Sequence, residues 1–299
     1  MRFPFTGVIA VDKPVGVSSR RVVDAVAKTL GTKAVGHAGT LDPLACGVVV
    51  VCVGHATRLV DFVHATRKRY RATFLLGRSS PSDDFETPFE EEADPVRPEQ
   101  AEIERALAGF RGDILQRPCA YSAVHVDGKR AYRLARKGRP MELTAKPVRI
   151  DRLEVTKYEW PRLGLDIECS SGTFVRAIGR DLAASLGTAA VMESLIRTAV
   201  GPFTIEASTP LDTLSPETTR AALLPPGVAV GHLPQVTLVG EELDAAVRGA
   251  LFESVFSPAR AIAACDEAGD LVGILQRHDT GRYRLKPNFR GLGGGATGA

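Results

Sequence analysis

The stretch KAVGHAGTLDPLACGVVVVCV, residues 33–53, joins a glycine-rich loop directly to an apolar run. The run 48–53 contains five valines and a cysteine, and Gly47 and Gly54 bound it. β-Branched residues in a short run between glycines predict a buried strand. Asp42 therefore lies in a loop anchored to a rigid core element, where reactive side chains are commonly held. Taken alone, however, an aspartate before proline is more often a turn former whose carboxylate binds the local backbone.

The composition is that of an ordinary globular protein. The chain has 299 residues, of which 44% are hydrophobic and 24% are charged. This length allows one large domain and a small one. No signal-peptide core follows Met1, and no apolar run approaches the ~20 residues that a membrane span requires. We therefore expect a cytoplasmic protein without membrane association.

The cysteines and histidines do not predict a metal site. The five cysteines lack C-x-x-C spacing, and the six histidines lack H-x-x-x-H spacing. Free thiols in a reducing compartment are expected instead. Phosphate-loop and dinucleotide-binding motifs are also missing from the sequence, so nucleotide-cofactor enzymes are poorly supported. We expect neither a metal nor a cofactor.

Charge is distributed unevenly along the chain. The formal net charge is only +3, but residues 129–152 hold nine basic and two acidic residues, a local charge of +7. The segment 83–104 is strongly acidic. This segregation suits a protein with one phosphate-facing side and one solvated side. The alternative for the basic stretch is a solvated helix face.

The first two hundred residues predict helices and strands in alternation. A helix capped by Ser18 or Ser19 ends at Gly31, and residues 70–76 form a strand. Further elements are a helix over 98–110, a strand over 163–170 and a helix over 175–186. Hairpin-length spacings argue against a regular βαβ repeat. The predicted fold is therefore α+β, with a mixed, largely antiparallel sheet and flanking helices.

The remaining chain predicts a separate small module. Residues 210–234 have the composition of a connection with one short helix. Short strands follow at 236–239, 259–265, 271–275 and 283–286, with a helix near 243–251, a pattern that suits a small β-barrel-like module. We expect a large domain over 1–232, a small domain over 233–290 and a disordered tail over 291–299.

Residues 36–47 follow the pattern Gly-His-x-Gly-Thr-Leu-Asp-Pro-x-Ala-x-Gly, which closely resembles the active-site motif of bacterial TruB-type tRNA pseudouridine synthases. Five further blocks resemble this family in the right order, at residues 7–19, 67–70, 111–123, 170–176 and 195–198. The resemblance reaches to about residue 232 and overturns the turn-former interpretation of Asp42.

The resemblance implies a pseudouridine synthase-like catalytic domain followed by a small, PUA-like RNA-binding domain. It also implies that uridine 55 in the T-loop of tRNA is isomerised without a guide RNA. The expected partner is the T-arm of tRNA. No obligatory protein partner is expected, and the chain is expected to be a monomer.

The family's three catalytic residues match positions in this sequence. By resemblance, Asp42 is the nucleophile, Arg176 pairs with it, and Tyr70 lies in the active site. An unpaired carboxylate in a closed pocket would tend to protonate, and arginine is a suitable partner because it stays charged. The aromatic ring can stack on an extruded base. Whether Asp42 attacks C1′ of the ribose or C6 of the uracil stays open.

The predicted substrate-binding residues are His37, Lys13, Phe174, Arg133 and Arg136. Lys13 can alternatively support the loop. The sequence departs from the family at several points. Phe174 stands where many relatives have tyrosine, and the usual Thr-Asp is replaced by Ser-Pro at residues 80–81, which weakens the assignment of Asp84 as a family aspartate. Cys119 and His125 replace an expected proline and lysine.

Two other functions remain as alternatives. One is a tRNA-binding folding chaperone whose catalysis is secondary or lost, and the other is a guide-RNA-dependent synthase of ribosomal RNA. Retention of Asp42, Tyr70 and Arg176 argues against loss of catalysis. The bacterial-like middle block and the small C-terminal module favour a stand-alone enzyme.

The basic stretch leads to a prediction about tRNA binding. Exchanging Arg133 and Arg136 for glutamate should raise KM and flatten the salt dependence of binding, because phosphate contacts carry affinity through counterion release. Single-turnover chemistry at saturating tRNA should change little. Binding over a salt series checks this, and an unchanged salt slope would mean that the stretch is only a solvated face.

Overall fold

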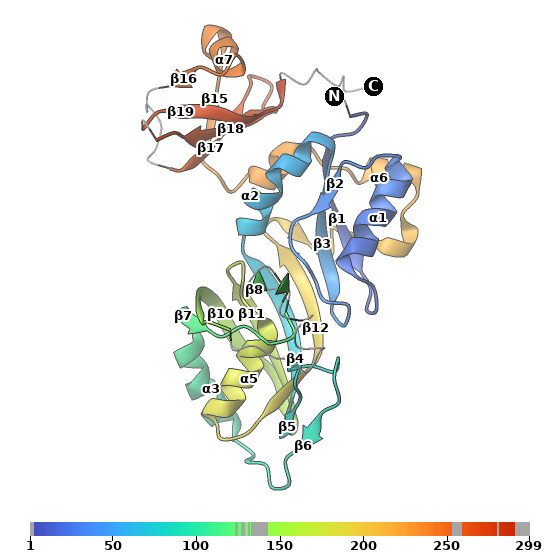
Figure 1. Cartoon of the computed structure of the whole chain (residues 1–299), viewed down its shortest axis with the longest axis vertical. Helices are drawn as coiled ribbons and strands as arrows, with labels where there is room; N and C mark the ends of the chain where they lie inside the picture. The colour runs from blue at the N-terminus through green and yellow to red at the C-terminus, as the bar shows by residue number, and fades with distance from the viewer. Residues whose placement is uncertain are drawn as a thin grey trace.

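The chain folds around one large and one small β-sheet (Figure 1). A computed structural model describes residues 3–122, 125–126, 129–130, 132, 143–252, 259–279 and 281–290. The large sheet has ten strands, and the small sheet has five. Within the described ranges, no helix has both the length and the apolar character needed to cross a bilayer.

The large sheet is mixed and mostly antiparallel, as predicted. Only the pairs β1–β14 and β3–β12 are parallel. The strand order is β14 (Thr209–Pro210), β1 (Gly7–Lys13), β3 (Cys46–Val53), β12 (Ala190–Val200), β4 (Lys68–Leu76), β11 (Arg162–Cys169), β10 (Lys146–Glu159) and β7 (Gly112–Gln116). Two short strands lie off this path, with β2 (Val35–His37) beside β3 and β13 (Phe203–Thr204) beside β12.

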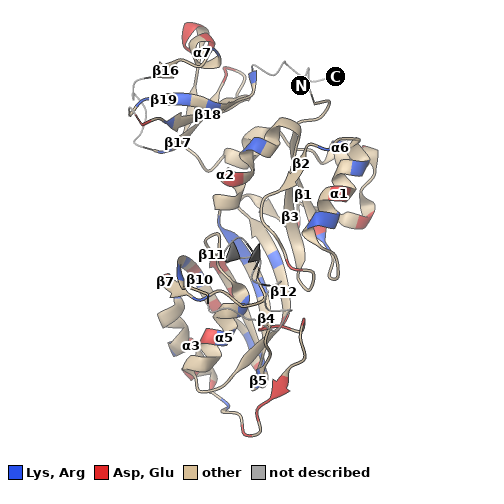
Figure 2. Cartoon of the chain, viewed as in Figure 1, with Lys and Arg blue, Asp and Glu red and all other residues tan. Residues whose placement is uncertain are grey.

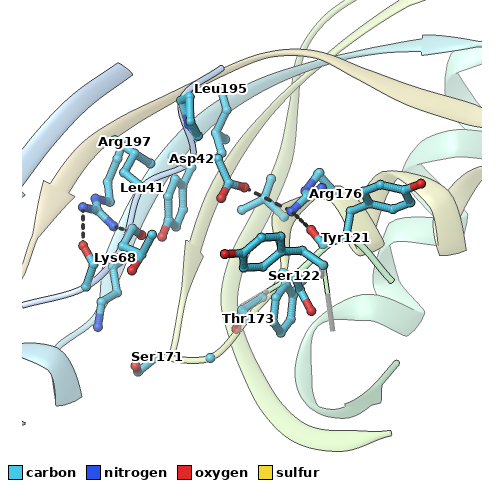
Figure 3. A pocket seen from close by; sticks show the side chains of 18 of the residues that line it. Leu41, Asp42, Lys68, Tyr121, Ser122, Ser171, Thr173, Arg176, Leu195 and Arg197 are labelled. Atoms are coloured by element: carbon cyan, nitrogen blue, oxygen red, sulfur yellow. Dashed lines mark hydrogen bonds and ion pairs between the residues drawn. The ribbon is translucent and has the colours of Figure 1, made fainter. Parts of the chain in front are cut away.

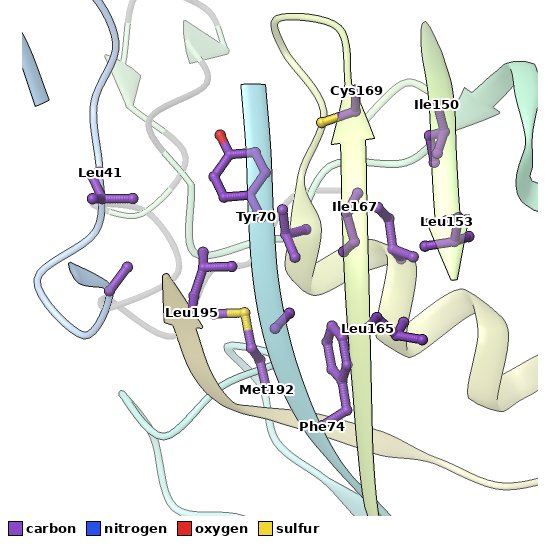
Figure 4. Packing of buried hydrophobic residues seen from close by; sticks show 14 of the residues in the cluster. Leu41, Tyr70, Phe74, Ile150, Leu153, Leu165, Ile167, Cys169, Met192 and Leu195 are labelled. Carbon is purple, nitrogen blue, oxygen red and sulfur yellow. The ribbon is translucent and has the colours of Figure 1, made fainter. Parts of the chain in front are cut away.

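Strand β4 carries the centre of the core. Its side chains alternate in burial, so Tyr70 and Phe74 face inward while Arg69 and Arg71 face solvent. Figure 4 shows Tyr70 and Phe74 on the same side of β4, among apolar side chains of β11 and β12. The predicted strand at 70–76 is confirmed. Because alternate side chains of a strand point to the same face, Phe74 and Tyr70, which are four residues apart, both point into the core.

The helices cover the apolar faces of this sheet. Helix α1 (Ser19–Leu30) is capped by Ser18 and ends at Gly31, which has a φ of 62°, as predicted. Helix α3 (Gln100–Leu107) is shorter than the predicted 98–110 at both ends. It begins after a capping box of Glu99 and Glu102 and not at Pro98, and its last turn is the 3₁₀ helix η2 (Ala108–Phe110). Helix α5 (Val175–Ser185) matches its prediction and begins directly after the loop that follows β11.

Shorter elements connect these parts. They are η1 (Gly54–Leu59), α2 (Val60–Ala65), β5 (Arg78–Ser79), β6 (Glu90–Glu91), β8 (His125–Val126), β9 (Lys129–Arg130), η3 (Leu211–Thr213), α6 (Pro216–Ala221) and η4 (Pro226–Val230).

The predicted C-terminal β module is present as a curled five-stranded sheet. Its order is β15 (Gln235–Thr237), β17 (Ala261–Cys265), β18 (Leu271–Arg277), β19 (Tyr283–Asn288) and β16 (Leu251–Phe252). Helix α7 (Gly240–Val247) begins and ends earlier than the predicted 243–251, because Gly249 adopts a φ of 87° and closes the helix.

The two sheets share an apolar cluster. Ala263 and Ile274 of the small sheet belong to the same buried cluster as Val50 of β3, Leu59 of η1 and Val230 of η4. The small sheet is therefore packed onto the region of β3 and η1. The boundary at residue 232 stays a prediction, and the predicted tail 291–299 lies outside the described residues.

Close packing of α5 on β4 leads to a stability prediction. A Cβ atom on Gly179 would lie 2.1 Å from Cε1 of Phe74, whose ring is fully buried. Gly179→Ala should therefore lower the free energy of unfolding by about 1–3 kcal/mol through overpacking. The control is Gly109→Ala, since no atom lies within 4 Å of that Cβ position. Urea unfolding measures both variants, and equal stability of the two would contradict the close packing.

Candidate active site

The loop carrying Asp42 lies between β2 and β3 and is fastened to the core by buried polar groups. Ser19 accepts a hydrogen bond from the backbone N–H of Leu41 at 2.8 Å and donates one to its carbonyl at 3.0 Å. Lys13 is completely buried, and its Nζ donates to the carbonyls of Pro14 and Ala45. These bonds hold the loop from both sides.

Arg197, on β12, is the strongest anchor of this loop. Its buried guanidinium donates to the carbonyl of Val48 at 2.7 Å and to those of Thr40 and Gly39 at 3.1 Å each. Strand β12 lies so close to β3 that a Cβ atom added to Gly47 would lie 2.3 Å from the carbonyl oxygen of Arg197. Arg197 falls within the family-like block 195–198, but no role was predicted for it. The available signal was an arginine that follows two apolar residues, Leu195 and Ile196, on a predicted motif.

Asp42 and Arg176 form an ion pair, as the resemblance implied. Nη2 of Arg176 lies 3.1 Å from Oδ2 of Asp42. The side chain of Arg176 is only 6% exposed, whereas that of Asp42 is 46% exposed. The guanidinium of Arg176 therefore lies in the interior, whereas the carboxylate of Asp42 faces a pocket.

A second carboxylate holds the other side of the same guanidinium. Nη1 of Arg176 lies 2.9 Å from Oδ2 of Asp84, a side chain that is 3% exposed. The guanidinium also donates to the carbonyls of Ser82 at 2.8 Å and Tyr121 at 2.9 Å. Burial alone would lower the pKa of Arg176, but the surrounding carboxylates outweigh it and raise the pKa above its ordinary value. Asp84 therefore lies beside the predicted site, and its match to the family aspartate stays a prediction.

Tyr70 lies on the inner face of β4 and lines the same pocket. Burial raises the pKa of its phenol, although the nearby Arg197 guanidinium partly offsets this. The hydroxyl is therefore protonated in the free protein at neutral pH. A neutral aromatic ring at the wall of the pocket can stack on a base.

The pocket that joins these residues has a volume of about 770 Å³. This is within the range of small-molecule sites and is large enough for a nucleotide. Figure 3 shows Asp42 between Arg176 and Leu195, with Tyr121 and Ser122 on the side of Arg176.

The predicted substrate-binding residues occupy different places. Phe174 lines the pocket, and its backbone is fixed by two hydrogen bonds with Gln116. His37 is half-buried on β2, and burial together with Arg197 lowers its pKa, so that its ring is neutral at pH 7. Lys13 lies beneath the loop, which favours its supporting role. Arg133 and Arg136 lie outside the described residues.

Exposed arginines on the central strands are paired with carboxylates of neighbouring strands. Figure 2 shows basic and acidic positions close together on β4, β10 and β11. Two such pairs are Arg69–Glu168 at 3.0 Å and Arg149–Asp113 at 2.8 Å, and Arg67, which directly precedes β4, pairs with Asp151 at 2.8 Å. Such surface pairs contribute little to stability, but they neutralise part of the charge that the sequence suggested for phosphate binding.

Lys68 leads to a prediction about pH. Its Nζ is buried and donates to the carbonyl of Thr66 at 2.7 Å and to that of His64. Burial, assisted by Arg197, lowers the pKa of Lys68 to about 8. In the unfolded chain lysine titrates near ~10.4, so between these values the unfolded state binds more protons. The free energy of unfolding should therefore rise with pH across this window.

Lys68→Met should remove this rise. The stability advantage of the parent over the variant should grow by about 1–2 kcal/mol between about pH 7.5 and about pH 9.5. Urea unfolding at both pH values measures it, with Lys28→Met on the exposed face of α1 as the control. A constant difference between parent and Lys68→Met would show that Lys68 titrates normally.

Comparison with known proteins places this site in a family. The model of the TruB family pseudouridylate synthase N-terminal domain matches residues 27–175. The tRNA pseudouridine synthase B of Mycobacterium avium (strain 104) is 44% identical over 213 residues, covering 70% of this chain and 69% of that protein. The protein of the same name from Mycobacterium bovis (strain BCG / Pasteur 1173P2) is 36% identical over 278 residues, covering 90% and 91%.

Solved structures agree on the fold. A Cbf5-Nop10-Gar1 complex contains a chain that superimposes with a TM-score of 0.73 at 24% identity, over 96% of this chain and 85% of that one. An H/ACA RNP bound to a substrate RNA containing 2′-deoxyuridine contains another, with a TM-score of 0.72 at 23% identity, over 96% and 86%. The predicted family and fold class are therefore confirmed: this chain belongs to the TruB family of pseudouridylate synthases.

Proposed function

We propose that this enzyme isomerises uridine to pseudouridine at position 55 in the T-loop of tRNA, without a guide RNA. The observation that carries the proposal is the Asp42–Arg176 ion pair at the wall of a nucleotide-sized pocket. The name tRNA pseudouridine synthase B, which the bacterial relatives share, supports tRNA as the substrate.

The geometry supports a division of roles among three residues. The target uridine must leave the RNA stack before a side chain can reach it. Asp42 is half-exposed and faces the pocket, where its carboxylate can act as the nucleophile, and the ion pair with Arg176 fixes its position. Tyr70 provides an aromatic surface for the extruded base. Attack at C1′ and attack at C6 are both compatible with this arrangement.

Partners, location and domain roles follow from the same proposal. We assign tRNA binding through the T-arm to residues 1–232, assisted by an RNA-binding module over 233–290. The name that the bacterial relatives share supports a stand-alone enzyme that acts on tRNA. We further propose that the enzyme is monomeric and acts in the cytoplasm. The structural neighbours that contain partner proteins are under 25% identical and bear on the fold alone. A chaperone without catalysis is disfavoured because Asp42, Arg176 and Tyr70 lie together in one pocket.

The proposal is tested with purified protein and an unmodified tRNA transcript, in the absence of guide RNA and other proteins. Asp42→Asn should abolish pseudouridine formation, because it removes the nucleophile while preserving shape, and tRNA affinity should stay within about tenfold. Asp24→Asn, an exposed aspartate on α1, is the control. Mapping should locate the product at position 55. Near-normal turnover by Asp42→Asn, or product at another position, would contradict the assignment.

A further inference from the structure

The hydroxyl of Ser122 is buried in the pocket. The residue is 4% exposed and lines the pocket together with Asp42, Tyr70 and Arg176 (Figure 3). Its Oγ has no hydrogen-bond partner in the part of the chain that the structure describes. Buried polar groups are nearly always hydrogen-bonded, so an exception in a ligand pocket points to a bond that the ligand supplies.

The backbone around this hydroxyl is well held. The carbonyl of the preceding Tyr121 accepts a bond of 2.9 Å from Arg176, and the carbonyl of Ser122 itself accepts one of 3.0 Å from the backbone N–H of Tyr132. The position of Ser122 is therefore coupled to the same guanidinium that holds Asp42. A fixed backbone with a free hydroxyl is the arrangement expected of a residue that contacts the substrate.

The chemistry of the proposed reaction identifies a suitable partner. The C1′–N1 bond breaks, its electron pair stays with the base, a C1′–C5 bond forms, the proton on C5 leaves and N1 gains a proton. Turning uracil over about the axis through N3 and C6 exchanges N1 with C5, and C2 with C4. The carbonyl oxygen O2 then occupies the place that O4 held, and O4 that of O2. A fixed donor therefore meets a carbonyl oxygen both before and after the turn.

We propose that the Ser122 hydroxyl donates a hydrogen bond to a carbonyl oxygen of the flipped uracil and holds the base while it turns over. This inference rests on the proposed function. After the C1′–N1 bond breaks, negative charge is shared between O2 and O4. A hydroxyl bond to such an oxygen is stronger than one to the neutral base. Ser122 should therefore assist the chemical step more than the initial binding of tRNA.

Ser122→Ala removes the donor and tests the first consequence. The single-turnover rate on an unmodified tRNA transcript should fall about 10–100-fold, while the Kd for tRNA stays within about threefold. The stability of the free protein to urea should not fall, because no bond made in the free state is lost. The matched control is Thr219→Val on α6, where the other buried hydroxyl without a partner among the described residues lies outside the pocket. This variant should leave the rate unchanged.

Thio-substituted transcripts test which atom is contacted. Sulfur is a weak acceptor, so 2-thiouridine or 4-thiouridine at the target position should slow the parent enzyme. One of the two substitutions should slow Ser122→Ala much less than the parent, because the bond is already absent. Equal slowing of parent and variant by both analogues would overturn the proposal, as would an unchanged rate for Ser122→Ala on normal tRNA. If the parent forms no pseudouridine in tRNA at all, the proposed function itself fails, and this outcome is separate from the others.

Discussion

Arg176 is a buried cation, and its partners bring together three segments that are distant in the sequence. Its guanidinium contacts Asp42, the backbone and side chain of residues 82–84, and the carbonyl of Tyr121. A buried charge is costly unless it is paired and fully hydrogen-bonded. Asp84 is nearly inaccessible and pairs with the guanidinium in the interior, whereas the more exposed Asp42 faces the pocket. Moving any of these segments would leave the guanidinium partly unsatisfied.

Arg197 is a second buried cation, on the other side of the loop between β2 and β3 that carries Asp42. Its guanidinium donates to the carbonyls of Gly39 and Thr40 in that loop and of Val48 in β3, and among the described residues it forms no ion pair. Its field contributes to the lowered pKa values of His37, His64 and Lys68, after burial in each case. A buried cation beside the pocket suits a ligand that carries phosphates and a base that gains negative charge as it departs.

What could be predicted from the sequence was local or came from the family resemblance. The apolar run 48–53 forms β3, and the caps of α1 lie where propensity places them. The contact of Arg197 could not be foreseen, because its acceptors are backbone carbonyls 149 to 158 residues away and no residue type marks them. Asp84 was obscured by the altered motif before it, and a left-handed residue, Asp83 with a φ of 59°, redirects the chain just ahead of it. The ion pairs of the surface arginines could not be predicted, because they depend on which residues of neighbouring strands lie opposite each other.

The apolar contact between the two sheets lies close to the loop that carries Asp42. Ala263 and Ile274 belong to the same apolar cluster as Leu59 of η1. Helix η1 directly follows β3, and β3 directly follows the loop that carries Asp42. Interfaces that are buried and apolar restrict relative motion more than polar ones do. If residues 233–290 bind one part of the tRNA, the packing of the two sheets fixes the distance between that part and the pocket. Recognition of position 55 would in this way depend on spacing along a folded RNA as well as on contacts to the uridine itself.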